Sequence, residues 1–169
     1  MDLQTIEKIK KEAHPKLRGE LQKIYEEANN KLGKSRLRFS MIFRTFKEQD
    51  DIYAQGRTKK GKIVTYSKAG QSYHNYGLAV DIVMLLDKDG NGTYETADWN
   101  TVADWDKDGQ ADWLEVVQIF VKYGWTWGFI KNGKRWDLPH FQKTFGLHWS
   151  ELLKRRNAGK VDKDGFVII

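Results

Sequence analysis

The apolar run at residues 78–86 constrains the fold of this chain more than any other segment. A short continuous apolar segment of this kind is typical of a buried strand, so we expect it at the centre of a sheet. The run contains one charged residue, Asp81. An unpaired carboxylate in such surroundings loses its hydration or is neutralised by a proton, and both outcomes are unfavourable. We therefore expect a metal ion at Asp81, because it would remove that penalty.

The other patterns predict an α+β domain in which helices flank a small antiparallel sheet. Pro15 suits the first turn of a helix, and Thr45 with Glu48 forms a capping-box pattern at the start of another. We expect residues 1–169 to form a single domain, since no linker-like segment divides the chain. The expected helices cover 3–32, 45–55, 113–123 and 148–157, a loop covers 56–71, and the expected strands cover 37–43, 78–86, 125–130 and 135–141, with a hairpin turn at 131–134.

Two histidines accompany Asp81 and predict a zinc site. His74 lies seven residues before Asp81, and His140 lies in an aromatic segment far downstream. The chain has no cysteine, so any zinc would be held by nitrogen and oxygen atoms. Two imidazoles and one carboxylate leave a fourth position for water, as a catalytic zinc site requires. His14 and His148 occur in helical contexts without such partners, and we expect them to be structural.

Asp137 is a further carboxylate, three residues before His140, and it has the chemistry of a general base for metal-assisted hydrolysis. On a regular strand, residues three apart point to opposite faces, which favours other roles: orienting His140 or pairing with Arg135. A kink at Pro139 would instead turn Asp137 towards the metal. Spacing alone leaves these roles open.

Two motifs carry a family resemblance. Ser-x-His-x-x-Gly-x-Ala-x-Asp at 72–81 and Asp-x-Pro-His-Phe at 137–141 resemble the zinc peptidoglycan peptidases of the D-alanyl-D-alanine carboxypeptidase type. The closer branch is the L-alanyl-D-glutamate endopeptidases found in phage endolysins. The resemblance runs from about residue 37 to 142, and its other parts are 44–49, 52–58 and 124–128. It implies a zinc hydrolase that cuts the peptidoglycan stem peptide, between L-alanine and D-glutamate.

The resemblance also implies a role for each matching residue. His74, Asp81 and His140 take the positions of the zinc ligands. Asp137 takes that of the carboxylate that deprotonates the zinc water, and Arg44 that of an arginine that stabilises the oxyanion.

Substrate binding is implied for three more residues, Gln49, Arg57 and Ser72, for which helix-surface salt bridges or loop hydrogen bonds are the alternative. Where many relatives have Gly-Gly, this chain has Gly128-Phe129, a difference expected to narrow the cleft and affect substrate preference.

An acidic, glycine-rich insertion over about residues 87–115 predicts calcium binding. Residues 104–115 follow the loop pattern of an EF-hand, and the candidate ligands are Asp104, Asp106, Asp108, Gln110, Asp112 and Glu115. Residues 87–98 fit the same pattern with a shorter closing side chain, and the candidates are Asp87, Asp89, Asn91, Thr93, Glu95 and Asp98. The alternative for both loops is a solvated acidic turn. A third acidic stretch, 162–165, stops before the pattern is complete and is expected to be a turn.

Charge and targeting signals narrow the setting. The formal net charge of +6 suits an anionic polymer such as the bacterial cell wall, whereas the basic residues are too scattered to favour nucleic acid. The first residues lack the features of a signal peptide, and no apolar run approaches the roughly 20 residues that span a bilayer. We expect a monomer that starts in the host bacterial cytoplasm and reaches peptidoglycan with a holin-type release partner.

Two alternatives to this function stay open. The first is a D,D-carboxypeptidase that removes the terminal D-alanine by the same zinc chemistry. The second, from another class, is a catalytically silent binding module that holds zinc and calcium, similar to the hedgehog signalling domain. The presence of Asp137 and Arg44 favours an enzyme.

Overall fold

The computed structural model describes residues 2–169, with the side chain of residue 131 left out. The elements follow the order α1 (Leu3–Glu12), α2 (Pro15–Lys31), β1 (Ser35–Met41), α3 (Phe46–Ala54), η1 (Tyr73–Tyr76), β2 (Ala79–Leu86), β3 (Thr96–Asp98), α4 (Asp112–Lys122), β4 (Thr126–Lys131), β5 (Lys134–Gln142) and α5 (Trp149–Asn157). η1 is a short 3₁₀ helix. The predicted α+β class is confirmed, with an antiparallel sheet and five α-helices.

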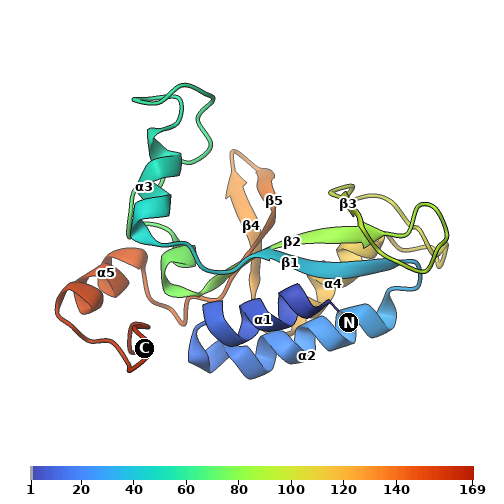
Figure 1. Ribbon diagram of the computed structural model, residues 1–169, viewed down its shortest axis with the longest axis horizontal. Coiled ribbons are helices and arrows are strands. Elements are labelled where there is room, and N and C mark those ends of the chain that lie inside the picture. Colours follow the sequence, from blue (N-terminus) through green and yellow to red (C-terminus); the bar gives the residue numbers. More distant parts are fainter. Residues whose placement is uncertain (1) are drawn as a thin grey trace.

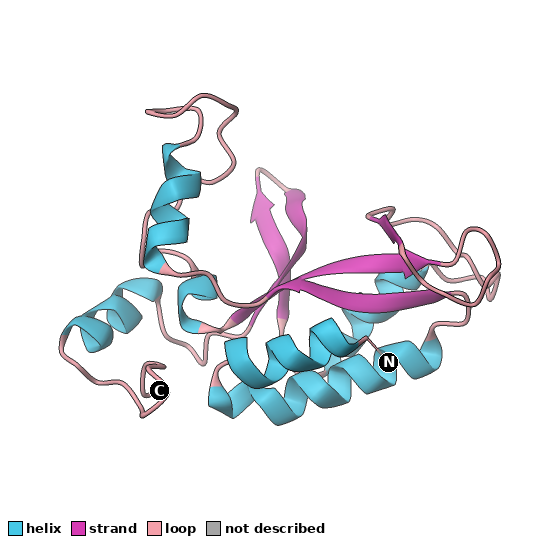
Figure 2. Cartoon of the chain, viewed as in Figure 1, coloured by secondary structure: helices cyan, strands magenta, loops and turns pink. Residues whose placement is uncertain are grey.

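The apolar run is the centre of the sheet, as predicted. The strands follow the order β1-β2-β5-β4, and β3 adds to β2 beside this path. β2 pairs with three other strands, and nearly all of its side chains are buried. Figure 2 shows α1 and α2 packed along one side of the strands, while the β4–β5 hairpin rises away from them.

The hydrophobic core lies between the helices α1, α2 and α4 and the inner face of the sheet. Leu21 and Ile24 of α2, Phe39 of β1 and Phe120 of α4 are fully buried there. The ring of Phe120 stacks on Phe141 of β5 with centroids 4.2 Å apart. This contact packs α4 directly against the strand that carries His140.

The predicted helix over 3–32 is two helices, separated at Ala13 and His14. Pro15 begins α2, and the His14 side chain accepts a hydrogen bond from the Lys16 backbone as a cap. Proline lacks a backbone donor and disfavours helical geometry in the residue before it, which explains the break. The capping box of Thr45 and Glu48 at the start of α3 is present as predicted.

The chain closes tightly around Gly77, the residue after η1. Gly77 has a positive φ of 67°, and a Cβ atom there would lie 2.7 Å from the Glu12 carbonyl oxygen and 2.7 Å from the His14 nitrogen. Phe166 of the C-terminal segment lies on the same glycine. His14 also hydrogen-bonds the carbonyl of Val167, which confirms a structural role for this histidine.

The two ends of the long β1–β2 ribbon differ. The acidic insertion extends from one end, while α3 and α5 lie at the other (Figure 1). Within residues 2–169, no helix combines the length and the apolar character needed to cross a bilayer.

Candidate metal centre

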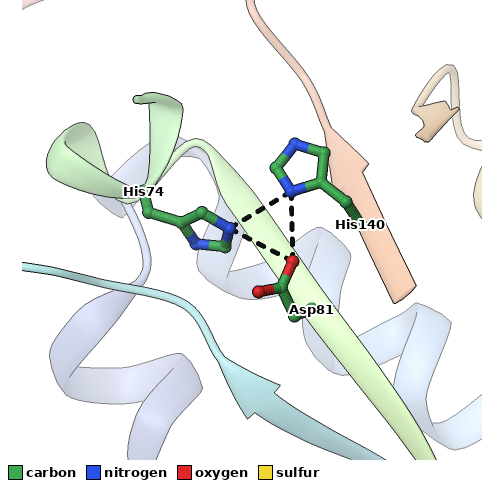
Figure 3. Close-up of side chains that lie close together, drawn as sticks. All are labelled: His74, Asp81 and His140. Atoms are coloured by element: carbon green, nitrogen blue, oxygen red, sulfur yellow. Dashed lines mark hydrogen bonds and ion pairs between the residues drawn. The ribbon is translucent and has the colours of Figure 1, made fainter. Parts of the chain in front are cut away.

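Three side chains far apart in the sequence meet at one point beside the central strand (Figure 3). His74 comes from η1, Asp81 from β2 and His140 from β5. His74 Nε2 lies 3.2 Å from Asp81 Oδ1 and 3.2 Å from His140 Nδ1, and the last two atoms are 3.1 Å apart. The three predicted ligands therefore present one atom each to a common centre.

The fold places each of these side chains by a local feature. Asp81 and His140 are cross-strand partners in the β2–β5 ladder, so their side chains share one face of the sheet. Gly77 ends η1 in a left-handed conformation, which turns the chain sharply from His74 into β2. The backbone nitrogen of Arg44 donates to the His74 carbonyl and ties η1 to the end of β1.

The donor set fits zinc. Zinc bonds of about 2.0–2.2 Å in a tetrahedron separate the ligand atoms by roughly 3.3–3.6 Å, close to the observed spacing. The second nitrogen of each imidazole is also held: His74 Nδ1 lies 2.9 Å from the Ile42 carbonyl, and His140 Nε2 lies 3.1 Å from Gln142 Oε1. Such outer contacts fix the ring orientation and leave the inner nitrogen free to bind a metal.

The charges of the cluster support one another. Burial acts to raise the pKa of Asp81, but the neighbouring His74 and His140 outweigh it and hold this pKa below its ordinary value. Burial acts to lower the pKa of His140, but the hydrogen bond to Asp81, the charge of Asp81 and the hydrogen bond to Gln142 together outweigh it and raise this pKa. An ionised Asp81 is the form that a metal ligand requires.

A wide bulge in β5 brings Asp137 to the same region. Trp127 pairs with Phe141 and Phe129 with Trp136, so β4 has one residue between these pairs and β5 has four, residues 137–140. Asp137 itself has a positive φ of 55°. The bulge explains how residues three apart can act together, which a regular strand would prevent.

The environment of Asp137 suits a general base. Removal of water by the surrounding protein raises its pKa, and the charges of His140, Asp81, His74 and Arg44 also act on it. A raised pKa brings a carboxyl group closer to neutral pH, where it can both accept and return a proton. The alternative pairing with Arg135 is not observed among the described contacts, where that guanidinium donates to the Trp127 carbonyl instead.

Gly128 makes the bulge possible. Its φ is 54°, and a Cβ atom there would lie 2.8 Å from the Trp136 carbonyl oxygen and 3.1 Å from that of Asp137. Phe129, which departs from the Gly-Gly expected from the resemblance, stacks on the His140 ring with centroids 4.9 Å apart. It also packs against Trp136. The departure from Gly-Gly thus places an aromatic wall against a metal-ligand candidate.

Arg44 is held beside the cluster by Gln49. The Gln49 side chain is fully buried; it accepts a hydrogen bond from Arg44 Nη1 at 3.0 Å and donates to the Ser67 carbonyl at 2.7 Å. Asn75 donates to the Arg44 carbonyl at 2.7 Å. Gln49 therefore positions an arginine, which differs from the substrate contact suggested by the resemblance.

The other two residues predicted to bind substrate are Arg57 and Ser72. Both Arg57 Nη atoms donate to backbone carbonyls, of Tyr53 and Thr65, and the guanidinium lies 3.9 Å from the Tyr53 ring centroid. These contacts support the alternative of loop hydrogen bonds. Ser72 is the N-cap residue of η1, two positions before His74, and its side chain makes no capping hydrogen bond.

Sequence reasoning missed three residues of this site: Gln142, Asn75 and Gly128 as a positioning residue. Gln142 follows His140 by two positions, so alternation along β5 placed it on the same face and was a usable signal. Asn75 and Gly128 act through contacts distant in sequence, which no local pattern revealed.

The acidic loop 104–115 forms a compact turn with its carboxylates inward. Asp104, Asp106 and Asp108 bring one oxygen each within 4.8 Å of one another. Asp104 accepts hydrogen bonds from the backbone nitrogens of Lys107, Asp108 and Gly109.

The last ligand candidates of that loop sit on α4. Glu115 is buried; its Oε1 lies 3.1 Å from Lys31 Nζ, and its Oε2 has no hydrogen-bond partner within the described part of the chain. Asp112 points elsewhere than expected: it accepts hydrogen bonds from the Ser35 hydroxyl and the Trp105 backbone nitrogen. Gln110 contributes a backbone nitrogen to Asp108 Oδ1.

The loop 87–98 repeats the turn but closes differently. Asp87, Asp89 and Glu95 form its carboxylate cluster, and Asp87 accepts from three backbone nitrogens. Asn91 Oδ1 accepts from Thr93. Asp98 lies in β3 and accepts from the Asn100 backbone at 2.6 Å, so it is absent from the cluster. Its predicted role as the closing ligand is not supported by this geometry.

The chain is similar to known proteins over a segment that includes both motifs. Residues 65–143 match a family described as D-alanyl-D-alanine carboxypeptidase. The peptidoglycan L-alanyl-D-glutamate endopeptidase CwlK of Bacillus subtilis is 50% identical over 101 residues, which cover 59% of this chain and 56% of that protein. The chain thus spans little more than half the length of this curated relative. The L-Ala D-Glu endopeptidase ChiX of Serratia marcescens, a solved structure, is 22% identical with a TM-score of 0.48, over 83% of this chain and 86% of that chain.

Proposed function

Residues 65–143 belong to the D-alanyl-D-alanine carboxypeptidase family of peptidases, and from this premise we propose that the protein is a zinc-dependent peptidoglycan peptidase. The bond cut is the L-Ala–D-Glu bond of the stem peptide, as the name of the CwlK relative suggests. The observation that carries the proposal is the convergence of His74, Asp81 and His140, close enough to Asp137 that their charges act on the pKa of its carboxyl group. The four residues fall within the matched segment.

Each residue contributes a distinct part of the hydrolysis. Zinc, held by His74, Asp81 and His140, would supply a Lewis acid and an activated water. Asp137 takes the proton of the attacking water and passes it to the leaving amine, which its raised pKa favours. Arg44, fixed by Gln49, offers a positive charge to the oxyanion that develops on the substrate carbonyl.

Digestion of purified peptidoglycan tests both the activity and the bond. Mass spectrometry should find released peptides that begin with D-glutamate. Release of free D-alanine would instead support the D,D-carboxypeptidase that the family description names.

An Asp137→Asn variant tests the mechanism and separates an enzyme from a silent binding module. It should retain one zinc per chain and lose roughly 10²–10⁴-fold in rate, because only the proton transfer is removed. Asp164→Asn, which removes a surface carboxylate in the C-terminal turn, is the matched control and should keep full activity. An Asp137→Asn protein as active as the parent would overturn the catalytic assignment.

The proposal includes calcium as a second cofactor, bound by the loop 104–115. Three convergent carboxylates and the buried Glu115, whose Oε2 has no hydrogen-bond partner among the described residues, support it, because an EF-hand loop closes with a bidentate Glu at this position. A site in loop 87–98 has less support, since Asp98 is directed away. Calcium titration of the zinc-loaded protein gives the number of sites directly.

Resemblance to the phage branch supports the remaining part of the proposal. The protein would act as an endolysin and a monomer, made in the host bacterial cytoplasm and released to the wall by a holin-type partner. Expression in a bacterial host with and without a holin tests this. Lysis only in the presence of the holin is the expected result, and equal lysis without it would contradict the release step.

A further inference from the structure

Lys31 forms an ion pair with Glu115, the residue expected to close the calcium loop. Lys31 ends α2, and its Nζ lies 3.1 Å from Glu115 Oε1. The Glu115 side chain is 1% exposed, whereas that of Lys31 is 46% exposed. The carboxylate is therefore fixed inside the protein, and the ammonium group can leave towards solvent.

The pair joins a buried carboxylate to a half-exposed ammonium group. A buried carboxylate needs a compensating charge, and Lys31 is the cation that the structure gives Glu115 among residues 2–169. Asp106 and Asp108 are close enough to act on the pKa of Glu115, and burial is the largest influence that raises it. One ammonium group thus lies near three carboxylates, those of Glu115, Asp106 and Asp108.

The turn after α2 contacts the acidic loop at two further points. The Gly33 backbone nitrogen donates to Asp106 Oδ2 at 3.0 Å, and a Cβ atom on Gly33 would lie 2.7 Å from that oxygen. Ser35 donates to Asp112 Oδ2. These contacts hold the segment that follows Lys31 against the loop and so place the end of α2 beside the carboxylates.

We propose that Lys31 is an internal competitor for calcium at the loop 104–115: its ammonium group neutralises Glu115 in the calcium-free protein, and calcium must displace it to bind. The inference rests on the calcium site of the proposed function. Lys31 then sets the affinity of the loop, because two cations near the same carboxylate repel each other.

Calcium titration of the zinc-loaded protein by calorimetry tests this, with Lys31→Met compared with the parent. The variant should bind calcium about tenfold more tightly, since a repelling charge near the ion is removed and its solvent exposure limits the effect. Lys23→Met is the matched control: Lys23 lies on an exposed position of the same helix, and its loss changes the net charge equally. The control should bind calcium as the parent does.

Thermal unfolding gives a second readout that does not depend on affinity. Without calcium, Lys31→Met should unfold at a lower temperature than the parent, because Glu115 is left buried without a cation. With saturating calcium the difference should disappear. Lys31→Gln, which keeps a polar side chain of similar length, serves if the first variant does not fold without calcium.

The outcomes separate the two levels of the proposal. Unchanged or weaker calcium binding by Lys31→Met would overturn the competitor role while the calcium site stands. Absence of calcium binding in the parent and the variants would overturn the site as well, and the peptidase activity measured on peptidoglycan would be untouched by that result. In a Glu115→Gln background, Lys31→Met should no longer tighten binding, and a persistent effect would contradict direct competition at Glu115.

Discussion

The buried cluster at the centre of the sheet and the acidic loop 104–115 position their side chains in different ways. His74 and His140 are 3% and 5% exposed, and their geometry is set by a strand ladder and by outer contacts with Ile42 and Gln142. The acidic loop orients its aspartates by hydrogen bonds to backbone nitrogens two to five residues away. The first centre is built by tertiary structure and the second by local sequence.

This difference teaches which changes each centre tolerates. The cluster keeps its shape as long as the sheet is intact, and its rigidity suits an ion that must present a fixed open position. In the acidic loop, Asp104 and Asp106 are half-buried and Asp108 is exposed, so we expect its geometry to respond to an ion bound there. Four predictions test the contrast, in order of decreasing expected effect.

Loss of a cluster ligand should have the largest effect. His140→Ala removes one of three donor atoms, and peptidoglycan hydrolysis should fall by more than the roughly 10–100-fold that loss of an outer partner of a metal ligand typically causes. Metal analysis should find less than one zinc per chain. Asp104→Ala, made in the acidic loop, should keep zinc and thereby show that the centres are independent. Retention of stoichiometric zinc by His140→Ala would contradict the ligand assignment.

Gly128→Ala should disturb the cluster without touching a ligand. The added methyl group would lie 2.8 Å from the Trp136 carbonyl, so the bulge that carries Asp137 has to shift. A displacement of about 1 Å at a catalytic group can cost about 100-fold in kcat, and zinc should stay bound. Gly133→Ala is the matched control, because Gly133 also has a positive φ, 72°, but open space around it. Equal losses in both variants would point to backbone strain in the hairpin rather than to Asp137.

Asp108→Asn should act on calcium alone. Removing one of three convergent carboxylates should weaken calcium binding by about tenfold, because affinity in such loops follows the number of charged ligands. Asp89→Asn in loop 87–98 should have a smaller effect, since that loop lacks its closing carboxylate. Calorimetric titration measures both. A larger effect of Asp89→Asn would reverse the ranking of the two loops.

Tyr76→Phe should change how the stability of the protein depends on alkaline pH. Burial raises the pKa of Tyr76 to about 12, and its hydroxyl donates to the Gly70 carbonyl at 2.8 Å. The unfolded chain loses this proton near pH 10, so wild-type stability should fall as the pH rises from there towards 12. At neutral pH, the free energy of unfolding of the variant should be about 1 kcal/mol lower than that of the parent, because this hydrogen bond is missing.

Urea unfolding at neutral and alkaline pH measures both effects. The alkaline decline should be shallower in the Tyr76→Phe variant than in the parent, and an identical decline would show that this phenol does not contribute.

Much of the fold could be predicted from sequence because its signals are local. The apolar run around Asp81, the capping box at Thr45 and the hairpin after residue 130 each appear where their patterns placed them. The match of residues 65–143 confirms the family resemblance. The break between α1 and α2 could have been inferred more firmly from Pro15, which the continuous helical prediction underweighted.

The rest depends on contacts between distant segments. The bulge at Asp137 needs the approach of β4 at Gly128, and the pairing of Lys31 with Glu115 needs α2 to pack beside α4. The short strand β3 formed because the acidic insertion folds back onto β2. Periodicity describes one segment at a time, so it cannot reveal which segments become neighbours.

The tight closure around Gly77 connects both terminal segments to the candidate metal centre. The Glu12–His14 junction and Phe166 lie directly against Gly77, whose turn leads from His74 into β2. Deleting the C-terminal segment that contains Phe166, or inserting residues between α1 and α2, would remove these contacts. We expect such changes to weaken zinc retention although no predicted ligand is altered, which makes the termini unsuitable places for trimming this protein.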